Sequence, residues 1–132
     1  MNKEILKIAL NTENFSFLKN HTHSIKLKNS TCGDEVKIYL IVKDEKITDF
    51  KYQGESCVYC QASASLLSKI SMNENKSKIN ELCDDAKHYF EGNVENIERK
   101  WKLLNKIFNE KNLSRKECIL LPFKTIKKIV SR

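Results

Sequence analysis

Hydrophobic and polar residues alternate from about residue 24 to residue 53, which is the spacing expected of half-buried β-strands. The alternation predicts strands at 24–28, 36–42 and 47–53, and the charged residues 43–46 are expected to form the turn between the last two. Consecutive strands with short connections usually pair antiparallel. We therefore predict a three-stranded antiparallel meander.

Most of the other hydrophobic residues recur every three or four positions, which is the spacing of one helical face. This spacing predicts helices at 2–10, 58–71, 78–91, 94–109 and from Ser114 to the C-terminus. Ser77 is expected to cap the third helix, and Ser114 with Glu117 has the spacing of a capping box for the last. Together these elements predict an α+β fold in which the meander packs against several helices.

The length of 132 residues suits one hydrophobic core, so we expect a single compact domain over residues 1–132. No apolar run approaches the ~20 residues needed to cross a membrane. The N-terminus mixes charged and apolar residues and is a poor secretory signal. Five cysteines without such a signal favour a reducing compartment, which we take to be the cytoplasm. There, cysteines are more often metal ligands or reactive thiols than disulfide partners.

The net charge of +7 is concentrated at the C-terminus, where residues 111–132 hold seven basic residues and one acidic residue. A basic helix can be a solvated face, a contact for an acidic protein surface, or a nucleic-acid site. No aromatic or glycine-rich binding motif accompanies this charge. We therefore rank a solvated face first and a protein partner second, and we expect neither nucleic acid nor a membrane as a partner.

Two loops beside the predicted meander carry the candidate chemistry. Cys32 and Asp34 lie just before the second strand, and Cys57 follows the third. Counting outward from a turn centred between residues 44 and 45 places position 32 opposite position 57 and Asp34 opposite Glu55. Unless a bulge shifts the register by one, we expect Cys32, Asp34 and Cys57 to meet at one end of the sheet.

Cys118 is the third candidate thiol. It falls in the first turn of the last helix beside Arg115 and Lys116, where the helix dipole and the basic neighbours are expected to lower its pKa. Three cysteines and one aspartate suit tetrahedral zinc or iron. We therefore predict a metal or cluster site formed by Cys32, Asp34, Cys57 and Cys118. The harder aspartate ligand should make this site more labile than one with four cysteines.

Two other interpretations of the cysteines remain open. Cys57 and Cys60 form a C-x-x-C motif at a helix start, which is compatible with a thiol–disulfide oxidoreductase. A thioredoxin-like protein would need parallel strands in a βαβ unit, which the predicted meander does not supply. A structural zinc site in an interaction module is the other alternative. Cys83 lies in an apolar helical stripe and is expected to be a buried structural residue.

Three segments that contain these residues resemble, in order, the motifs of the U-type iron–sulfur cluster assembly scaffolds, the family of IscU, SufU and the NifU N-terminal domain. They are Asn29-Ser30-Thr31-Cys32-Gly33-Asp34, Gly54-Glu55-Ser56-Cys57 with Ala62-Ser63-Ala64-Ser65, and residues 115–123. Glu117 stands where the IscU branch has a histidine. Together with room for a helical insertion around 73–93, this makes the chain most similar to the SufU branch.

The resemblance implies a role in iron–sulfur cluster biogenesis. Cys32, Asp34, Cys57 and Cys118 would bind zinc or a transient iron–sulfur cluster, and Cys32 would accept persulfide sulfur from a cysteine desulfurase. Downstream iron–sulfur proteins would be the recipients. The protein would then be a scaffold or a zinc-dependent sulfur-transfer partner rather than a stand-alone enzyme.

Overall fold

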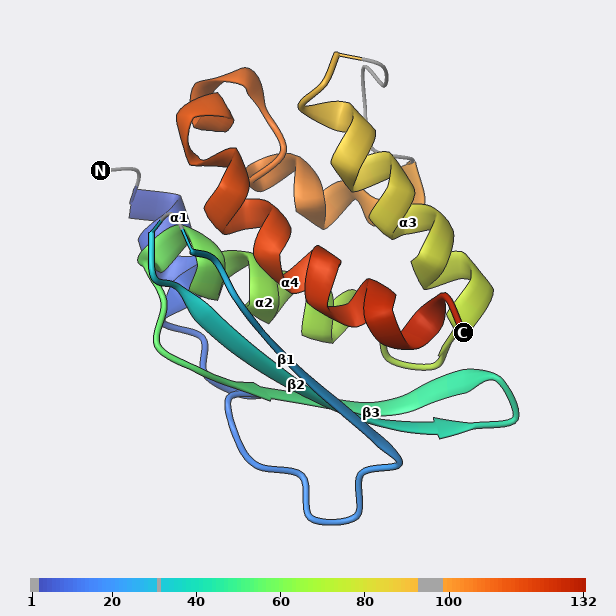
Figure 1. Cartoon of the computed structure of the whole chain (residues 1–132). Helices are drawn as coiled ribbons and strands as arrows, with labels where there is room; N and C mark the ends of the chain where they lie inside the picture. The colour runs from blue at the N-terminus through green and yellow to red at the C-terminus, as the bar shows by residue number, and fades with distance from the viewer. Residues whose placement is uncertain (1–2, 31, 93–98) are drawn as a thin grey trace.

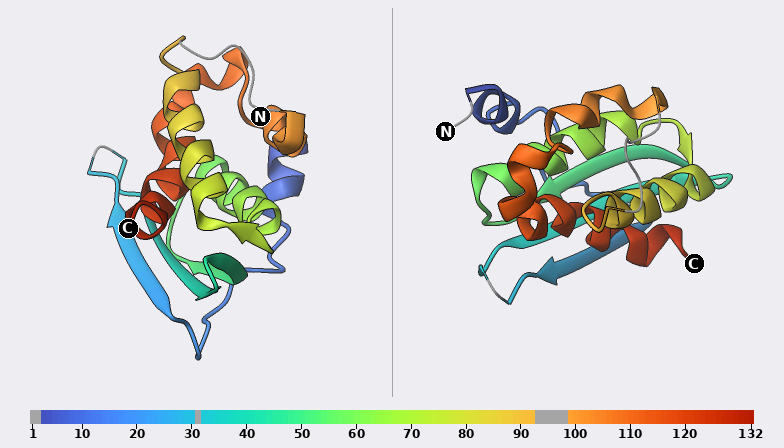
Figure 2. Two further views of the ribbon diagram at one scale, coloured as in Figure 1. Left: turned by 90° about the vertical axis from the view of Figure 1, so that its right-hand side faces the viewer. Right: turned by 90° about the horizontal axis from the view of Figure 1, so that it is seen from above.

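The computed structural model describes residues 3–30, 32–92 and 99–132. One antiparallel sheet carries helices on one of its faces, as the views in Figures 1 and 2 show, and the predicted α+β class is confirmed. The elements in order are α1 (Lys3–Ala9), β1 (His23–Lys28), β2 (Glu35–Lys43), β3 (Lys46–Gln53), α2 (Val58–Ile70), β4 (Glu74–Asn75), α3 (Lys76–Tyr89), the 3₁₀ helices η1 (Arg99–Lys106) and η2 (Glu110–Arg115), and α4 (Lys116–Val130). Within these ranges no helix is long and apolar enough to cross a bilayer.

The sheet has four strands in the order β1-β2-β3-β4, so the prediction of three strands is wrong. The added strand β4 is only two residues long and pairs with Lys46 and Ile47 at the start of β3. A strand of two residues is too short to show alternation, so the sequence pattern does not predict it. The predicted insertion around 73–93 coincides with β4 and α3, and its status as an insertion stays a prediction.

The hairpin of β2 and β3 contains the turn that the sequence predicts. Asp44 and Glu45 both have positive φ, at 53° and 65°, as in a two-residue turn whose twist matches that of the strands. A bulge follows, because Val42 pairs with Ile47 whereas Ile41 pairs with Asp49. The register predicted without a bulge is therefore wrong by one residue beyond this point.

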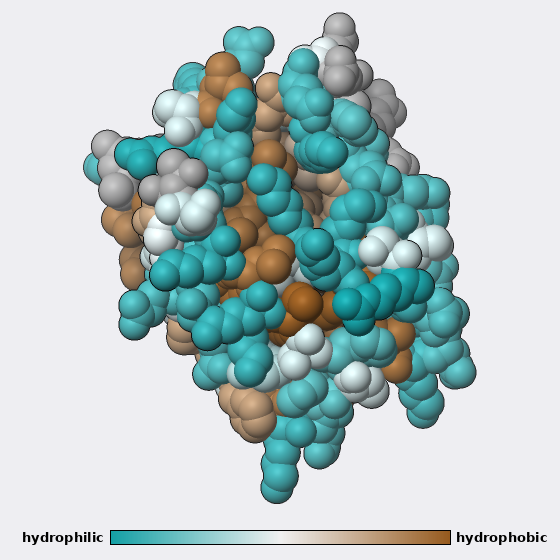
Figure 3. Space-filling view, viewed as in Figure 1, coloured by the Kyte–Doolittle hydropathy of each residue, from teal (hydrophilic) through white to brown (hydrophobic). Residues whose placement is uncertain are grey.

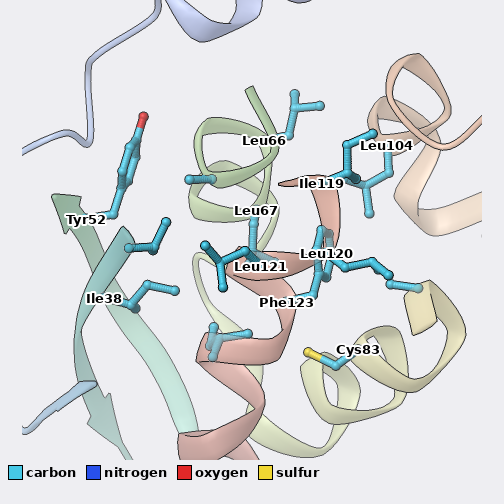
Figure 4. Close-up of a cluster of buried hydrophobic side chains, with 14 of the residues drawn as sticks. Ile38, Tyr52, Leu66, Leu67, Cys83, Leu104, Ile119, Leu120, Leu121 and Phe123 are labelled. Carbon is cyan, nitrogen blue, oxygen red and sulfur yellow. The ribbon is translucent and has the colours of Figure 1, made fainter. Parts of the chain in front are cut away.

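The hydrophobic core lies between the sheet and the helices. Side chains of β2, β3, α2 and α4 meet there, together with Leu104 of η1 (Figure 4). Cys83 points from α3 toward this cluster and is 4% exposed, which confirms its predicted place in the core. On the outside, the face shown in Figure 3 is mostly hydrophilic, with apolar side chains gathered over α4.

The last helix is buried on more sides than its sequence predicts. Ile119, Phe123, Ile126 and Val130, which recur at the spacing of one helical face, are buried, but Leu120 and its neighbours on the other side are buried too. The reason is that α4 packs against β1, β2 and α2 and is also covered by α3. α4 is thus a central element of the domain.

Several predicted helix boundaries differ from the structure. α4 begins at Lys116 after the N-cap Arg115, and Ser114 lies in η2, so the predicted capping box is wrong. Asn75 rather than Ser77 is the N-cap of α3. The helix predicted at 94–109 is a 3₁₀ helix at Arg99–Lys106 only, with a non-helical backbone at Trp101, and residues 93–98 lie outside the described residues.

Candidate metal centre

The first cysteine loop connects β1 to β2 and closes on itself through its backbone. The Gly33 N–H donates to the Asn29 carbonyl at 2.8 Å, and the Asn29 N–H donates to the Asp34 carbonyl at 2.7 Å. Gly33 has a φ of +78°, which residues with a side chain rarely adopt. The loop leaves Cys32 exposed, while Asp34 is 7% exposed.

Gly54 brings the second cysteine segment against this loop. Its φ is +138°, and a Cβ atom at this position would overlap the carbonyl oxygen of Glu35. The close approach lets the Glu35 N–H donate to the Glu55 carbonyl at 2.9 Å. Cys57 follows as the N-cap of α2, and its N–H donates to Oδ1 of Asp34 at 3.0 Å. The Asp34 carboxylate thus holds the start of α2 beside the first loop.

The side chains of Cys32, Asp34 and Cys118 converge although Cys118 comes from the distant helix α4. One ligand atom of each residue lies within 4.8 Å of the other two. Cys118 is 7% exposed, so the group extends from the exposed Cys32 into the protein. The structure therefore brings together three of the four side chains that the sequence singles out.

The donor atoms fit a metal ion. Oδ2 of Asp34 is buried and has no hydrogen-bond partner among the described residues. A buried carboxylate oxygen without a donor is costly, and a bound cation would remove this cost. Thiolate sulfur with one carboxylate oxygen is a donor set that zinc and iron accept.

Among the described residues, Cys57 lies beside the group of Cys32, Asp34 and Cys118 but is not part of it. It is partly exposed, and its backbone rather than its thiol makes the hydrogen bond to Asp34. Its thiol nevertheless lies close enough to Cys118 to affect that residue's protonation. The role of Cys57 as a fourth ligand stays a prediction.

The lowered pKa predicted for Cys118 is wrong. Burial raises the pKa of this thiol well above its usual range, and Cys57 and then Asp34 raise it further. The charge of Arg115, which was expected to act in the opposite direction, lies over the ring of Tyr59 at 5.3 Å from the ring centroid. Sequence spacing could not reveal this contact, because it joins the first turn of α2 to the residue that precedes α4.

Cys60 lies one helical turn after Cys57 and is fully buried. Burial raises the pKa of its thiol to about 12, and the negative charges of Asp34, Cys57 and Cys32 add to this effect. Cys60 is therefore a neighbour of the candidate centre, placed on its inner side. In the sequence, the C-x-x-C spacing of Cys57 and Cys60 is the signal that Cys60 lies near the centre.

Comparison with known proteins identifies the family. The family model described as the NifU-like N terminal domain matches residues 1–87. A Thermotoga maritima protein named iron–sulfur cluster assembly scaffold protein IscU is 36% identical over 107 residues, which are 80% of this chain and 74% of that protein. This chain belongs to the U-type iron–sulfur cluster assembly scaffold family. The resemblance drawn from the three motifs is confirmed.

Solved structures show the same U-type fold. A NifU-like protein (N-terminal) from Brucella abortus superposes with a TM-score of 0.88 at 22% identity, over 98% of this chain and 91% of that one. A protein from Fervidobacterium islandicum, described as an iron–sulfur cluster assembly scaffold for the SUF system, gives a TM-score of 0.85 at 25% identity, over 98% and 96% of the two chains. The likeness to the SufU branch is thereby supported. Cys118 lies beyond the range of the family model, so its place in the site rests on its position in the structure.

Proposed function

We propose that this U-type protein accepts sulfur from a cysteine desulfurase and assembles an iron–sulfur cluster for downstream acceptor proteins. Its site would be formed by Cys32, Asp34, Cys57 and Cys118. The observation that carries the proposal is the convergence of Cys32, Asp34 and Cys118, whose ligand atoms lie within 4.8 Å of one another. Oδ2 of Asp34 is buried there and has no hydrogen-bond partner among the described residues. Iron and sulfide are the cargo of this reaction.

Cys32 is the proposed sulfur acceptor because its side chain is exposed at the tip of a loop. Its thiolate attacks the outer sulfur of the desulfurase persulfide, and the desulfurase thiolate leaves. The sulfane sulfur is then bonded to Cys32. Cys32 is more exposed than Cys57 and Cys118, so the partner can deliver sulfur to it at the protein surface.

Asp34 and Cys118 are proposed to hold the site in place during this exchange. Asp34 is fixed by the N–H of Cys57, and Cys118 is held in the first turn of the buried helix α4. Cys32 can therefore move while the other donors keep their positions.

A resting zinc ion would fit the same four residues. When bound, zinc would keep the thiols deprotonated and shield them from oxidation. A site with one aspartate should exchange such an ion more readily than a site with four cysteines.

The first test follows the sulfur. The protein is incubated without oxygen with a cysteine desulfurase and L-cysteine, and persulfides are located by mass spectrometry of alkylated peptides. We expect the persulfide on Cys32, its loss in Cys32→Ser, and its retention in the control Cys83→Ser. Unchanged sulfur transfer to the Cys32→Ser variant would overturn the assignment of Cys32.

The second test measures metal and acid-labile sulfide in protein purified without oxygen. About one zinc per chain without sulfide would support a sulfur-transfer resting state, whereas iron with sulfide would support a loaded scaffold. Cys118→Ala should lower either content, and Cys83→Ala should not. If wild type and Cys118→Ala are equally metal-free and equally stable, the four-residue site is wrong.

A further inference from the structure

Cys57 and Cys60 form a pair of neighbouring thiols. The proposed function assigns Cys57 a role as a ligand and assigns Cys60 no role. Cys57 is the N-cap of α2, and Cys60 is the third residue of its first turn. Residues three apart are neighbours on the surface of a helix, so Cys60 lies on the same side of this helix start as Cys57. The Gln61 N–H donates to the Cys57 carbonyl at 3.0 Å, so the helix is formed from its first turn. The C-x-x-C spacing at a helix start is that of reactive dithiols.

The surroundings of the two sulfurs differ. Cys57 is partly exposed, whereas Cys60 is fully buried beneath it. The Cys60 thiol is close enough to Cys57, Cys32 and Asp34 to feel their negative charges. Reagents can therefore reach the Cys57 thiol, whereas the Cys60 thiol can be reached only by its neighbours. This arrangement suits a two-step thiol–disulfide exchange.

Cluster assembly also poses a redox problem that this pair can solve. A persulfide delivers sulfur at the oxidation level of the element, whereas an iron–sulfur cluster contains sulfide. Each sulfur atom must therefore gain two electrons after it arrives. Two thiols that become one disulfide release that number of electrons.

We propose that Cys57 and Cys60 form a resolving dithiol that releases the delivered sulfur as sulfide. The sulfane sulfur first moves from Cys32 to Cys57, when the Cys57 thiolate attacks the outer sulfur of the Cys32 persulfide and the Cys32 thiolate leaves. The Cys60 thiol then attacks Sγ of Cys57 and gives its proton to the outer sulfur. The Cys57–Cys60 disulfide forms, the bond from Cys57 to the outer sulfur breaks, and hydrogen sulfide leaves.

Atoms and electrons balance in this sequence. The outer sulfur gains two electrons, the two cysteines lose two, and the proton of the Cys60 thiol leaves with the outer sulfur. A dithiol reductant of the thioredoxin class must then reduce the disulfide before the next cycle. This inference rests on the proposed function, because sulfur must first reach the site.

The test uses the whole metal-free protein and inorganic polysulfide as the sulfur donor, under chelator and without oxygen. Cleavage after Lys51 and Lys69 yields a peptide of residues 52–69 that contains both cysteines. In wild type we expect this peptide to lose two hydrogens through an internal disulfide, with release of about one sulfide per chain. Without polysulfide the disulfide should be absent.

Two variants sharpen the result. Cys60→Ser should keep the added sulfur on the site cysteines and form no disulfide in this peptide. The control Cys83→Ser removes another buried thiol and should behave like wild type. Cys60→Ala is a second variant in case serine destabilises the buried position, and circular dichroism checks the fold of each.

The possible outcomes separate this inference from the proposed function. A stable persulfide on Cys32 or Cys57 of wild type, without the disulfide, overturns the inference and leaves the sulfur-acceptor role intact. Equal release of sulfide from wild type and from Cys60→Ala means that another thiol supplies the electrons, which also overturns it. If polysulfide adds sulfur to none of the site cysteines, both the inference and the proposed acceptor role fail.

Discussion

The two oxygens of Asp34 have different surroundings, and this difference explains how one side chain can serve both the fold and the site. Oδ1 accepts the N–H of Cys57 at 3.0 Å, which ties the first loop to the start of α2. Oδ2 is buried and has no partner among the described residues, so it remains available for a cation. Glutamate would be too long by one methylene to make the same backbone contact from this position.

Gly54 is the residue whose replacement should damage the site most directly through the backbone. In Gly54→Ala the new Cβ would overlap the Glu35 carbonyl at a φ of +138°. We expect the free energy of unfolding in urea to fall by at least about 2 kcal/mol. Gly92→Ala is the control, because Gly92 also has positive φ but nothing within 4 Å, and it should cost only about 1 kcal/mol. Equal losses in the two variants would contradict the steric explanation.

Cys83 should make the stability depend on alkaline pH. Burial raises the pKa of its thiol from 9.0 to about 12 in the folded protein. The folded state holds this proton more tightly than the unfolded chain, so the associated stability is present below about pH 9 and is lost as the pH rises toward 12.

Through this thiol, wild type should lose about 1 kcal/mol of stability between about pH 7 and about pH 10. Cys83→Ala should not show this part of the alkaline loss. Urea unfolding at both pH values measures this loss. Ile79→Val, on the same helix, is the control and should lower the stability equally at both. If Cys83→Ala shows the full alkaline loss of wild type, the thiol is not its source.

Two helix N-termini meet at the candidate centre, and side-chain contacts between α2 and α4 fix their distance. The Ser63 hydroxyl on α2 donates to the Ile119 carbonyl on α4 at 2.6 Å. At the surface, the Arg115 guanidinium lies over the Tyr59 ring. These contacts hold Cys57 and Cys118 on facing elements, so the geometry of the site depends on helix packing as well as on the loops.

The start of α4 gives a test at the level of one element. Ser114 lies outside α4 and does not cap it, so Ser114→Ala should change the free energy of unfolding by less than about 0.5 kcal/mol. An N-cap serine would cost about 1 kcal/mol on the same replacement. Ser63→Ala is the matched control, and the loss of its buried hydrogen bond should cost about 1 kcal/mol. If urea unfolding shows a larger loss of unfolding free energy for Ser114→Ala than for Ser63→Ala, Ser114 does cap α4 and our interpretation is wrong.

The basic residues near the C-terminus divide into two groups when the chain is folded. Lys127 contacts Asp84 on α3 at 2.8 Å, and Lys124 contacts Glu117 at 3.2 Å, so part of this charge is neutralised within the domain. Lys116 is exposed at the start of α4, two residues before Cys118. Lys128 is exposed near the other end of the same helix, which offers a comparison along one element.

Docking of an acidic desulfurase surface over the candidate centre should therefore depend on Lys116. We expect Lys116→Glu to weaken binding by roughly tenfold, and we expect the affinity of wild type to fall as salt is added. Lys128→Glu makes the same charge change away from the centre and should have a smaller effect. Binding measured by calorimetry that is insensitive to salt, or equal effects of the two variants, would refute electrostatic docking at this end of α4.

The local pattern predicted much of this structure. Alternation located β1, β2 and β3, and the charged residues 43–46 form the turn that was expected. The motifs around Cys32, Cys57 and Cys118 were sufficient to suggest the family that the comparisons confirm. The short strand β4 was missed, and the bulge between Ile41 and Val42 was left open, because each depends on pairing with a neighbouring strand rather than on its own residues.

The types of the elements and the chemistry of the candidate residues follow from the amino-acid sequence, since spacing and side-chain type are local properties. The meeting of Cys118 with Cys32 and Asp34 was inferred from their chemistry, but its geometry and burial come only from the packing of α4 against the sheet. The protonation of Cys118 depends on that packing too. A helix N-terminus and basic neighbours predicted a lower pKa, whereas desolvation and the nearby Cys57 and Asp34 raise it. Burial and the distances between groups far apart in the chain exist only once the tertiary structure has formed.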